Sequence, residues 1–167
     1  MPLTPFHLGP GLFFGMTTFR FFNLIAFLIG SILLDIEPAL VVLYNLNYPY
    51  LSYPHHGILH SFLGGIVTAL LIALILNNYK EKIRNYLNTF NLSQKSSFLS
   101  IFLGGLLGHW IHIIFDSFMH YDVFPFWPSH FNPFLNLISV PQNYFLCSII
   151  GMIGITLLII KVKKVKA

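Results

Sequence analysis

Histidine and aspartate side chains interrupt the apolar run GGLLGHWIHIIFDSFMH at helical spacing. His109, His112, Asp116 and His120 are separated by three, four and four residues. At about 100° per residue, these side chains fall on one stripe of an α-helix. A histidine and an aspartate one turn apart can bind the same cation, through an imidazole nitrogen and a carboxylate oxygen. The stripe therefore indicates a metal site, although a polar stripe hydrogen-bonded between helices has the same spacing.

A second histidine group occupies the segment HHGILHS, in which His55 and His56 precede His60 and Ser61. His56 and His60 lie one turn apart if the segment is helical. Antiparallel packing of this segment against the stripe would place both groups at one level. Two pairs of small residues have the spacing that allows close backbone approach: Ser61 and Gly65, and Gly104 and Gly108. The segment lacks the glutamate of the HExxH motif, so it does not resemble a zincin.

Two shorter motifs could add ligands to these histidines. TPFHLGPG contains His7, and LLDIEP contains Asp35 and Glu37. Each residue also has an ordinary interpretation, since a histidine near a terminus is often exposed, Asp35 could cap a helix, and Glu37 could lie in the headgroup layer. His7 and Asp35 reach the same end of the molecule only if the chain folds back between them.

The composition is that of a membrane protein. Of the 167 residues, 56% are apolar and 8% are charged, and the mean hydropathy is +0.74. A soluble domain carries about 25% charged residues, so a soluble enzyme and a disordered chain are disfavoured. The net charge of +4 comes from basic clusters at the ends of apolar runs, which is typical of membrane anchoring and not of nucleic-acid binding. The single cysteine, Cys147, excludes an internal disulfide and a thiolate metal cluster.

Apolar segments of about 20 residues predict helices that cross a bilayer. We expect an all-α polytopic integral membrane protein, with residues 1–167 in one membrane domain. The predicted helices are 5–18, 21–34, 57–77, 97–119 and 143–160, and the outer loops are 35–56 and 120–142. A single span through residues 11–34 is the alternative to the first two helices, but it would bury Arg20 at a cost of at least ~2.5 kcal/mol. We therefore predict a hairpin with Arg20 at its turn.

The charges predict the orientation in the membrane. In the hairpin arrangement all nine Lys and Arg side chains lie on one side, which should be cytoplasmic and which also holds the C-terminus. All eight histidines and most of the acidic residues lie at or near the opposite face. A His/Asp site is therefore expected at the outer, non-cytoplasmic end of the bundle.

In their order along the chain, these motifs resemble the YdjM-like membrane-bound metal-dependent hydrolases. The resemblance rests on TPFH, D-x-E-P, H-x-G-x-x-H-S and G-x-x-x-H-x-x-x-D, followed by Pro125, Trp127 and Pro128, and it spans about residues 4–135. It implies an inner-membrane location and metal-dependent hydrolysis. More distantly, the ligand order resembles zinc-dependent phospholipase C and the S1/P1 nuclease family.

The more distant resemblance implies how the ligands divide between ions. By it, one metal would be held by four residues: Asp35, His60, His112 and Asp116. Asp116 would bridge to a second metal held by His7, and His120 is a further candidate ligand. The sequence lacks the N-terminal Trp amine and the later H-xxx-E pair of those enzymes, so a site of one or two ions is expected. Candidates for contacts around the ligands or with substrate are Glu37, His55, His56, Ser61, His109 and Asp122.

These observations predict a metal-dependent hydrolase of phosphoesters in a lipid or lipid-linked substrate, with membrane lipid as its surroundings. Zinc is favoured by the His/Asp ligands, with manganese or iron as alternatives. Asp35 and Asp116 are the carboxylates expected to take part in catalysis, whereas Ser61 lacks a defined triad as a nucleophile. Two other functions stay open. One is an inactive scaffold stabilised by metal, and the other is a metal or proton transporter, which the apolar cytoplasmic halves of the helices disfavour.

Overall fold

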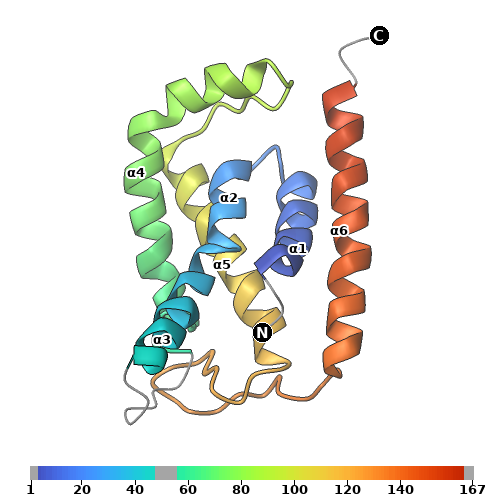
Figure 1. Cartoon of the computed structure of the whole chain (residues 1–167). Coiled ribbons are helices and arrows are strands. Elements are labelled where there is room, and N and C mark those ends of the chain that lie inside the picture. Colours follow the sequence, from blue (N-terminus) through green and yellow to red (C-terminus); the bar gives the residue numbers. More distant parts are fainter. Residues whose placement is uncertain (1–3, 48–55, 164–167) are drawn as a thin grey trace.

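The computed structural model describes residues 4–47 and 56–163, and these residues form helices and loops without a strand (Figure 1). The elements are α1 (Thr4–Thr17), α2 (Leu24–Gly30), the 3-10 helix η1 (Leu33–Asp35), α3 (Ile36–Asn47), α4 (Phe62–Asn88), α5 (Phe98–Ser117) and α6 (Val140–Lys163). Within the described ranges, four stretches are long and apolar enough to cross a membrane: Leu24–Asn47, Phe62–Asn88, Phe98–Ser117 and Val140–Lys163. The prediction of an all-α polytopic membrane protein is confirmed.

The first two helices form the predicted hairpin. α1 and α2 pack against each other, and Arg20 lies exposed in the turn between them (Figure 1). The chain therefore reverses direction within residues 11–34, which rules out a single span there. Each of these helices is shorter than the about 20 residues that a span requires. α1 packs on α6 and α2 packs on α5, so the longer helices flank the hairpin.

The segment after the hairpin differs from the prediction. The predicted helix 21–34 is interrupted after Gly30, and residues 36–47, expected within the outer loop 35–56, form α3. Pro38 lies in the first turn of α3, where a proline is tolerated because its missing N–H would have no partner within the helix. The D-x-E-P motif is therefore a helix start, and it places Asp35 and Glu37 on either side of the junction between η1 and α3.

The helix predicted at 57–77 is displaced along the chain. It begins at Phe62, because the Ser61 hydroxyl caps it by accepting a hydrogen bond from the Gly64 N–H at 3.0 Å. It continues to Asn88, since the Lys, Glu and Arg residues at 80–84 are good helix formers. His56 and His60 consequently lie in a loop before α4 and not within a helix.

Glycines set the distance between α2 and α5. A Cβ atom at Gly30 would collide with the carbonyl oxygen of Gly105, and one at Gly108 with that of Phe27. The expectation that Gly104 and Gly108 pack on Ser61 and Gly65 is wrong, because the hairpin covers that side of α5. Gly65 does make a close contact with α5, but against the rings of His109 and Trp110.

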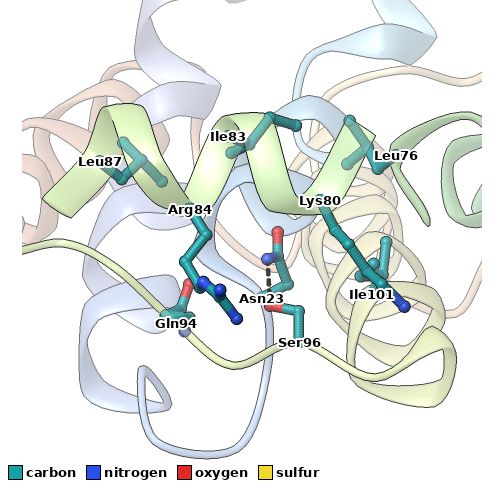
Figure 2. A pocket seen from close by; sticks show the side chains of 9 residues that line it. All are labelled: Asn23, Leu76, Lys80, Ile83, Arg84, Leu87, Gln94, Ser96 and Ile101. Atoms are coloured by element: carbon teal, nitrogen blue, oxygen red, sulfur yellow. Dashed lines mark hydrogen bonds between the residues drawn. The ribbon is translucent and has the colours of Figure 1, made fainter. Parts of the chain in front are cut away.

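One end of the bundle gathers the basic side chains, and we call it the basic end. It consists of the α1–α2 turn, the last turns of α4, the α4–α5 loop and the end of α6 (Figure 1). Gln94 links the α4–α5 loop to the α1–α2 turn, because its amide donates to the carbonyls of Phe19 at 2.6 Å and Phe22 at 2.8 Å and accepts from the Leu24 N–H at 2.9 Å. Asn23 donates to the Ser96 hydroxyl at 2.7 Å beneath Lys80 and Arg84 (Figure 2).

Candidate metal centre

The opposite end of the bundle, which we call the histidine end, brings together four side chains from three elements. His7 comes from α1, Asp35 from η1, and His112 and Asp116 from α5. One ligand atom from each of the four lies within 4.8 Å of the others. His7 Nε2 lies 3.1 Å from Asp116 Oδ1, and His112 Nε2 lies 3.0 Å from Asp116 Oδ2 and 3.8 Å from Asp35 Oδ1. We call this group the first centre.

The interruption after α2 orients His112. Because the helix ends at Gly30, the Ser31 carbonyl has no partner in the next turn of a helix. It accepts a hydrogen bond of 2.8 Å from His112 Nδ1. A carbonyl oxygen can only accept, so the proton is on Nδ1 and the lone pair of neutral His112 is on Nε2. That lone pair points toward the carboxylates of Asp35 and Asp116.

The atoms that meet in the first centre do not satisfy one another. Among the described residues, His7 Nε2, His112 Nε2 and Asp116 Oδ1 have no hydrogen-bond partner, although all three are buried. A neutral imidazole lone pair facing a carboxylate oxygen at 3.0 Å is repulsive unless a cation lies between them. Zinc bonds of about 2.0–2.1 Å would hold two ligand atoms about 3.3 Å apart. The residues present therefore fit a divalent ion.

A second group adjoins the first and is built from two histidine–carboxylate pairs. His60 Nδ1 lies 2.6 Å from Glu37 Oε2, and His56 Nδ1 lies 2.9 Å from Asp122 Oδ1. The Nε2 atoms of His56 and His60 are buried without a partner among the described residues. Ligand atoms of His56, His60 and Asp116 lie within 4.8 Å of one another.

His120 lies beside this second group, just beyond the end of α5. Its ring centroid is 4.6 Å from that of His56, and its Nε2 is buried without a partner in the described part of the chain. Burial lowers the pKa of His120 to about 4 and also lowers the pKa of His60 below its usual 6.5. Burial raises the pKa of Asp122, but the hydrogen bond from His56 outweighs it and holds this pKa below 3.8. At neutral pH the imidazoles of His60 and His120 are therefore uncharged and can act as ligands.

The structure groups the candidate ligands differently from the expectation. His7, expected at a separate metal, lies with Asp35, His112 and Asp116, whereas His60 lies with His56. Three residues expected around the ligands have clearer roles. His56 is itself a candidate ligand, and the carboxylates of Glu37 and Asp122 orient His60 and His56. Ser31 was not predicted, since it acts through its main-chain carbonyl. The only sequence signal for it is the glycine before it, where the helix ends.

Two candidate residues lie away from both groups. His109 is on the predicted stripe, but it is seven residues, or about 10 Å of helix, from Asp116. Its Nε2 donates to the Leu59 carbonyl at 3.0 Å and its Nδ1 lies 2.8 Å from the Thr68 hydroxyl, so both nitrogens are used. Ser61 is used as the cap of α4 and also donates to the Ile58 carbonyl at 2.7 Å. His55 lies outside the described residues.

Comparison with known proteins identifies the family. No curated protein and no solved structure matches the chain. The model of the YdjM inner membrane protein family matches residues 3–166, nearly the whole chain. This agrees with four stretches long enough to span a membrane and with the resemblance of the sequence motifs. The chain therefore belongs to the YdjM inner membrane protein family.

Proposed function

We propose that the protein is a membrane-embedded, divalent-metal-dependent hydrolase that acts on a phosphoester of a lipid or lipid-linked molecule. One contact carries the proposal. The hydrogen bond to the Ser31 carbonyl leaves the lone pair of neutral His112 on Nε2, and this atom lies 3.0 Å from the buried carboxylate of Asp116. Zinc is the ion that suits two imidazoles and two carboxylates best, with manganese or iron as alternatives.

The residues of the first centre have two roles, which are binding of the ion and proton transfer. A bound divalent ion would polarise a phosphoryl oxygen and make water more acidic. His7, His112 and Asp116 are almost completely buried and would hold the ion. The Asp35 side chain is about 12% exposed, so it is the carboxylate placed to exchange a proton with incoming water. It would serve as a ligand or as the general base.

A lipid substrate is supported by the surroundings of the site. Phe62 directly follows Ser61, and it lines an apolar groove of about 390 Å³ together with Trp110 and Trp127. This groove begins two residues from His60, so an acyl or prenyl chain lying there would bring an attached phosphoester to the histidine end. The location of all described cations at the basic end favours a histidine end outside the cytoplasm.

Transport through the bundle is disfavoured by the packing below the site. Ala26, Ile72, Ala73 and Ile101 are almost completely buried and form a continuous apolar cluster between α2, α4 and α5. A cation crossing this cluster would meet no ligand among the described residues that form it. A catalytically inactive scaffold that binds the same ion is the alternative that activity measurements decide.

The test combines elemental analysis with hydrolysis assays on the purified full-length chain in detergent. We expect bound zinc or another divalent ion, loss of that ion in His112→Ala, and phosphate-ester hydrolysis by the metal-loaded wild type on a panel of phospholipids and lipid-linked phosphates. His130→Ala is the matched control, because His130 is an exposed histidine at the same end. Bound metal without turnover of any substrate would favour the scaffold, and a metal-free protein would remove the basis of the proposal.

A further inference from the structure

The two histidine–carboxylate pairs of the second group fix where the protons are. Glu37 and Asp122 are acceptors when ionised, so the Nδ1 atoms of His60 and His56 must donate to them. In the neutral rings, Nε2 then carries the lone pair. A carboxylate behind a histidine is the arrangement that orients and strengthens metal-binding imidazoles. Both rings are therefore prepared to bind a cation through Nε2.

The carboxylates are themselves held in place. Glu37 lies in the first turn of α3, where its charge is stabilised by the helix dipole, and the backbone of Gly57 and Leu59 hydrogen-bonds to it. Asp122 accepts a second hydrogen bond from the main-chain N–H of His56, at 3.2 Å. Each pair joins the loop before α4 to another element, so this loop is positioned by the same contacts that orient its histidines.

His56 and His60 lie beside Asp116, and one ligand atom of each of the three residues lies within 4.8 Å of the others. His60 Nε2 lies 3.9 Å from Asp116 Oδ2, and the ring centroids of His56 and His60 are 4.6 Å apart. Both rings are nearly inaccessible, with 4% of His56 and 0% of His60 exposed. No hydrogen-bond partner for either Nε2 is present in the described ranges. A buried lone pair without a donor is costly, and here two such rings lie beside one buried carboxylate.

We propose a second metal site formed by His56, His60 and Asp116, with Asp116 bridging the two ions and with Glu37 and Asp122 as positioning residues. The inference rests on the proposed function only through Asp116, which the first centre shares. The first centre offers four protein ligands, which fill a tetrahedral zinc ion, whereas the second offers three. Three protein ligands leave a position free for an exogenous ligand, as in catalytic zinc sites. The second ion would therefore have a position for water or the phosphoester, in addition to the position that the first ion keeps when Asp35 acts as the general base.

The test measures metal stoichiometry and affinity on the full-length chain in detergent, by elemental analysis and by titration of the metal-free protein with Co²⁺ followed in the visible spectrum. The wild type should bind two ions per chain and His56→Ala one, with the remaining ion lost in His56→Ala/His112→Ala. His130→Ala should bind two. Circular dichroism of each variant verifies that the helices are retained.

Asp122→Asn separates positioning from simple structural support and is milder than removing a ligand. The substitution keeps the volume of the side chain and leaves His56 in place, but the amide is a weaker acceptor for His56 Nδ1 than the carboxylate. The second ion should then bind about 10–100-fold more weakly, while the affinity of the first ion stays as in wild type. If Asp122→Asn binds both ions as tightly as the wild type does, the positioning role of Asp122 is overturned.

The outcomes distinguish this inference from the proposed function. A wild type that saturates at one ion, kept by His56→Ala and lost by His112→Ala, overturns the second site and leaves the proposed function standing. A wild type that binds no ion overturns both. Two ions that are both retained in His56→Ala place the second ion elsewhere and overturn the assignment of its ligands.

Discussion

The two ends of the bundle are both polar, but they use their polar groups in opposite ways. At the basic end, Gln94 makes three hydrogen bonds to main-chain groups. Asn23 bonds to Ser96 (Figure 2) and also accepts from the Ala26 N–H at 2.8 Å. The cavity between them holds about 10 Å³, which is room for one water molecule. At the histidine end, nine buried side-chain atoms lack a partner within the described residues, and eight belong to His or Asp.

This difference distinguishes polar groups that support the fold from polar groups that are available to bind a ligand. A buried donor or acceptor left unpaired costs about 1–3 kcal/mol, so a purely structural network would pair its atoms, as the basic end does. The histidine end instead fixes Nδ1 of His112, His60 and His56 with Ser31, Glu37 and Asp122, and it leaves Nε2 of these three rings without a partner among the described residues. The lesson is that pairing on one side of a ring, with none on the other, marks a ligand.

Asp116→Asn should have the largest effect, because Asp116 is the carboxylate that both groups share. The amide keeps the volume but removes the charge that offsets the cations. We expect hydrolysis to fall by about 100-fold or more and bound metal to fall with it. The comparison is Asp122→Asn, measured in the same assay, which should lose less of both. Wild-type turnover by Asp116→Asn with metal retained would contradict a functional histidine end.

Cysteine labelling sharpens the comparison by telling which end faces the cytoplasm. In a chain with Cys147→Ser, an impermeant thiol reagent added outside intact cells should label Tyr121→Cys at the histidine end. It should leave Asn88→Cys at the basic end unlabelled until the membrane is opened. Tyr121 is 80% exposed, so access within the protein does not limit its reaction. The reverse pattern would place the site in the cytoplasm.

Gln94→Ala should affect stability alone. It removes three hydrogen bonds and leaves the carbonyls of Phe19 and Phe22 without their donor, which should cost about 1–3 kcal/mol of unfolding free energy. Metal content at saturating zinc should match the wild type. Denaturation in detergent, followed by circular dichroism, gives the first quantity, and elemental analysis gives the second. Loss of metal in this variant would mean that the two ends are not independent.

Thr68→Val should have the smallest effect and tests whether His109 belongs with the structural or the functional groups. The substitution removes the hydroxyl next to His109 Nδ1 and keeps a branched side chain of similar size. We expect a loss of about 1 kcal/mol in stability, with the metal stoichiometry unchanged. A change in the number of bound ions would mean that His109 affects metal binding.

The sequence predicts which residues lie at the site better than it predicts which of them contact one another. The apolar runs and the position of Arg20 predict the hairpin, because a lone arginine is costly inside a membrane. The histidine–aspartate spacing predicts the helix that carries His112 and Asp116. The start of α4 is not predicted, because the spacing of His56 and His60 also fits a helical turn, whereas Ser61 caps a helix that begins at Phe62. The pairing of His60 with Glu37 depends on α3, and the residues of α3 are predicted from the sequence to lie in a loop.

The contact between Ser31 and His112 determines where the site is vulnerable to mutation. The bond belongs to the peptide backbone, so Ser31→Ala leaves its acceptor in place and should be nearly silent. What sets its length is the distance between α2 and α5, and that distance depends on Gly30 and Gly108 having no side chain. A genetic screen for loss of function should therefore recover alanine or valine at these glycines as readily as changes in the ligands. The most sensitive positions of this metal centre then include residues that carry no polar side chain at all.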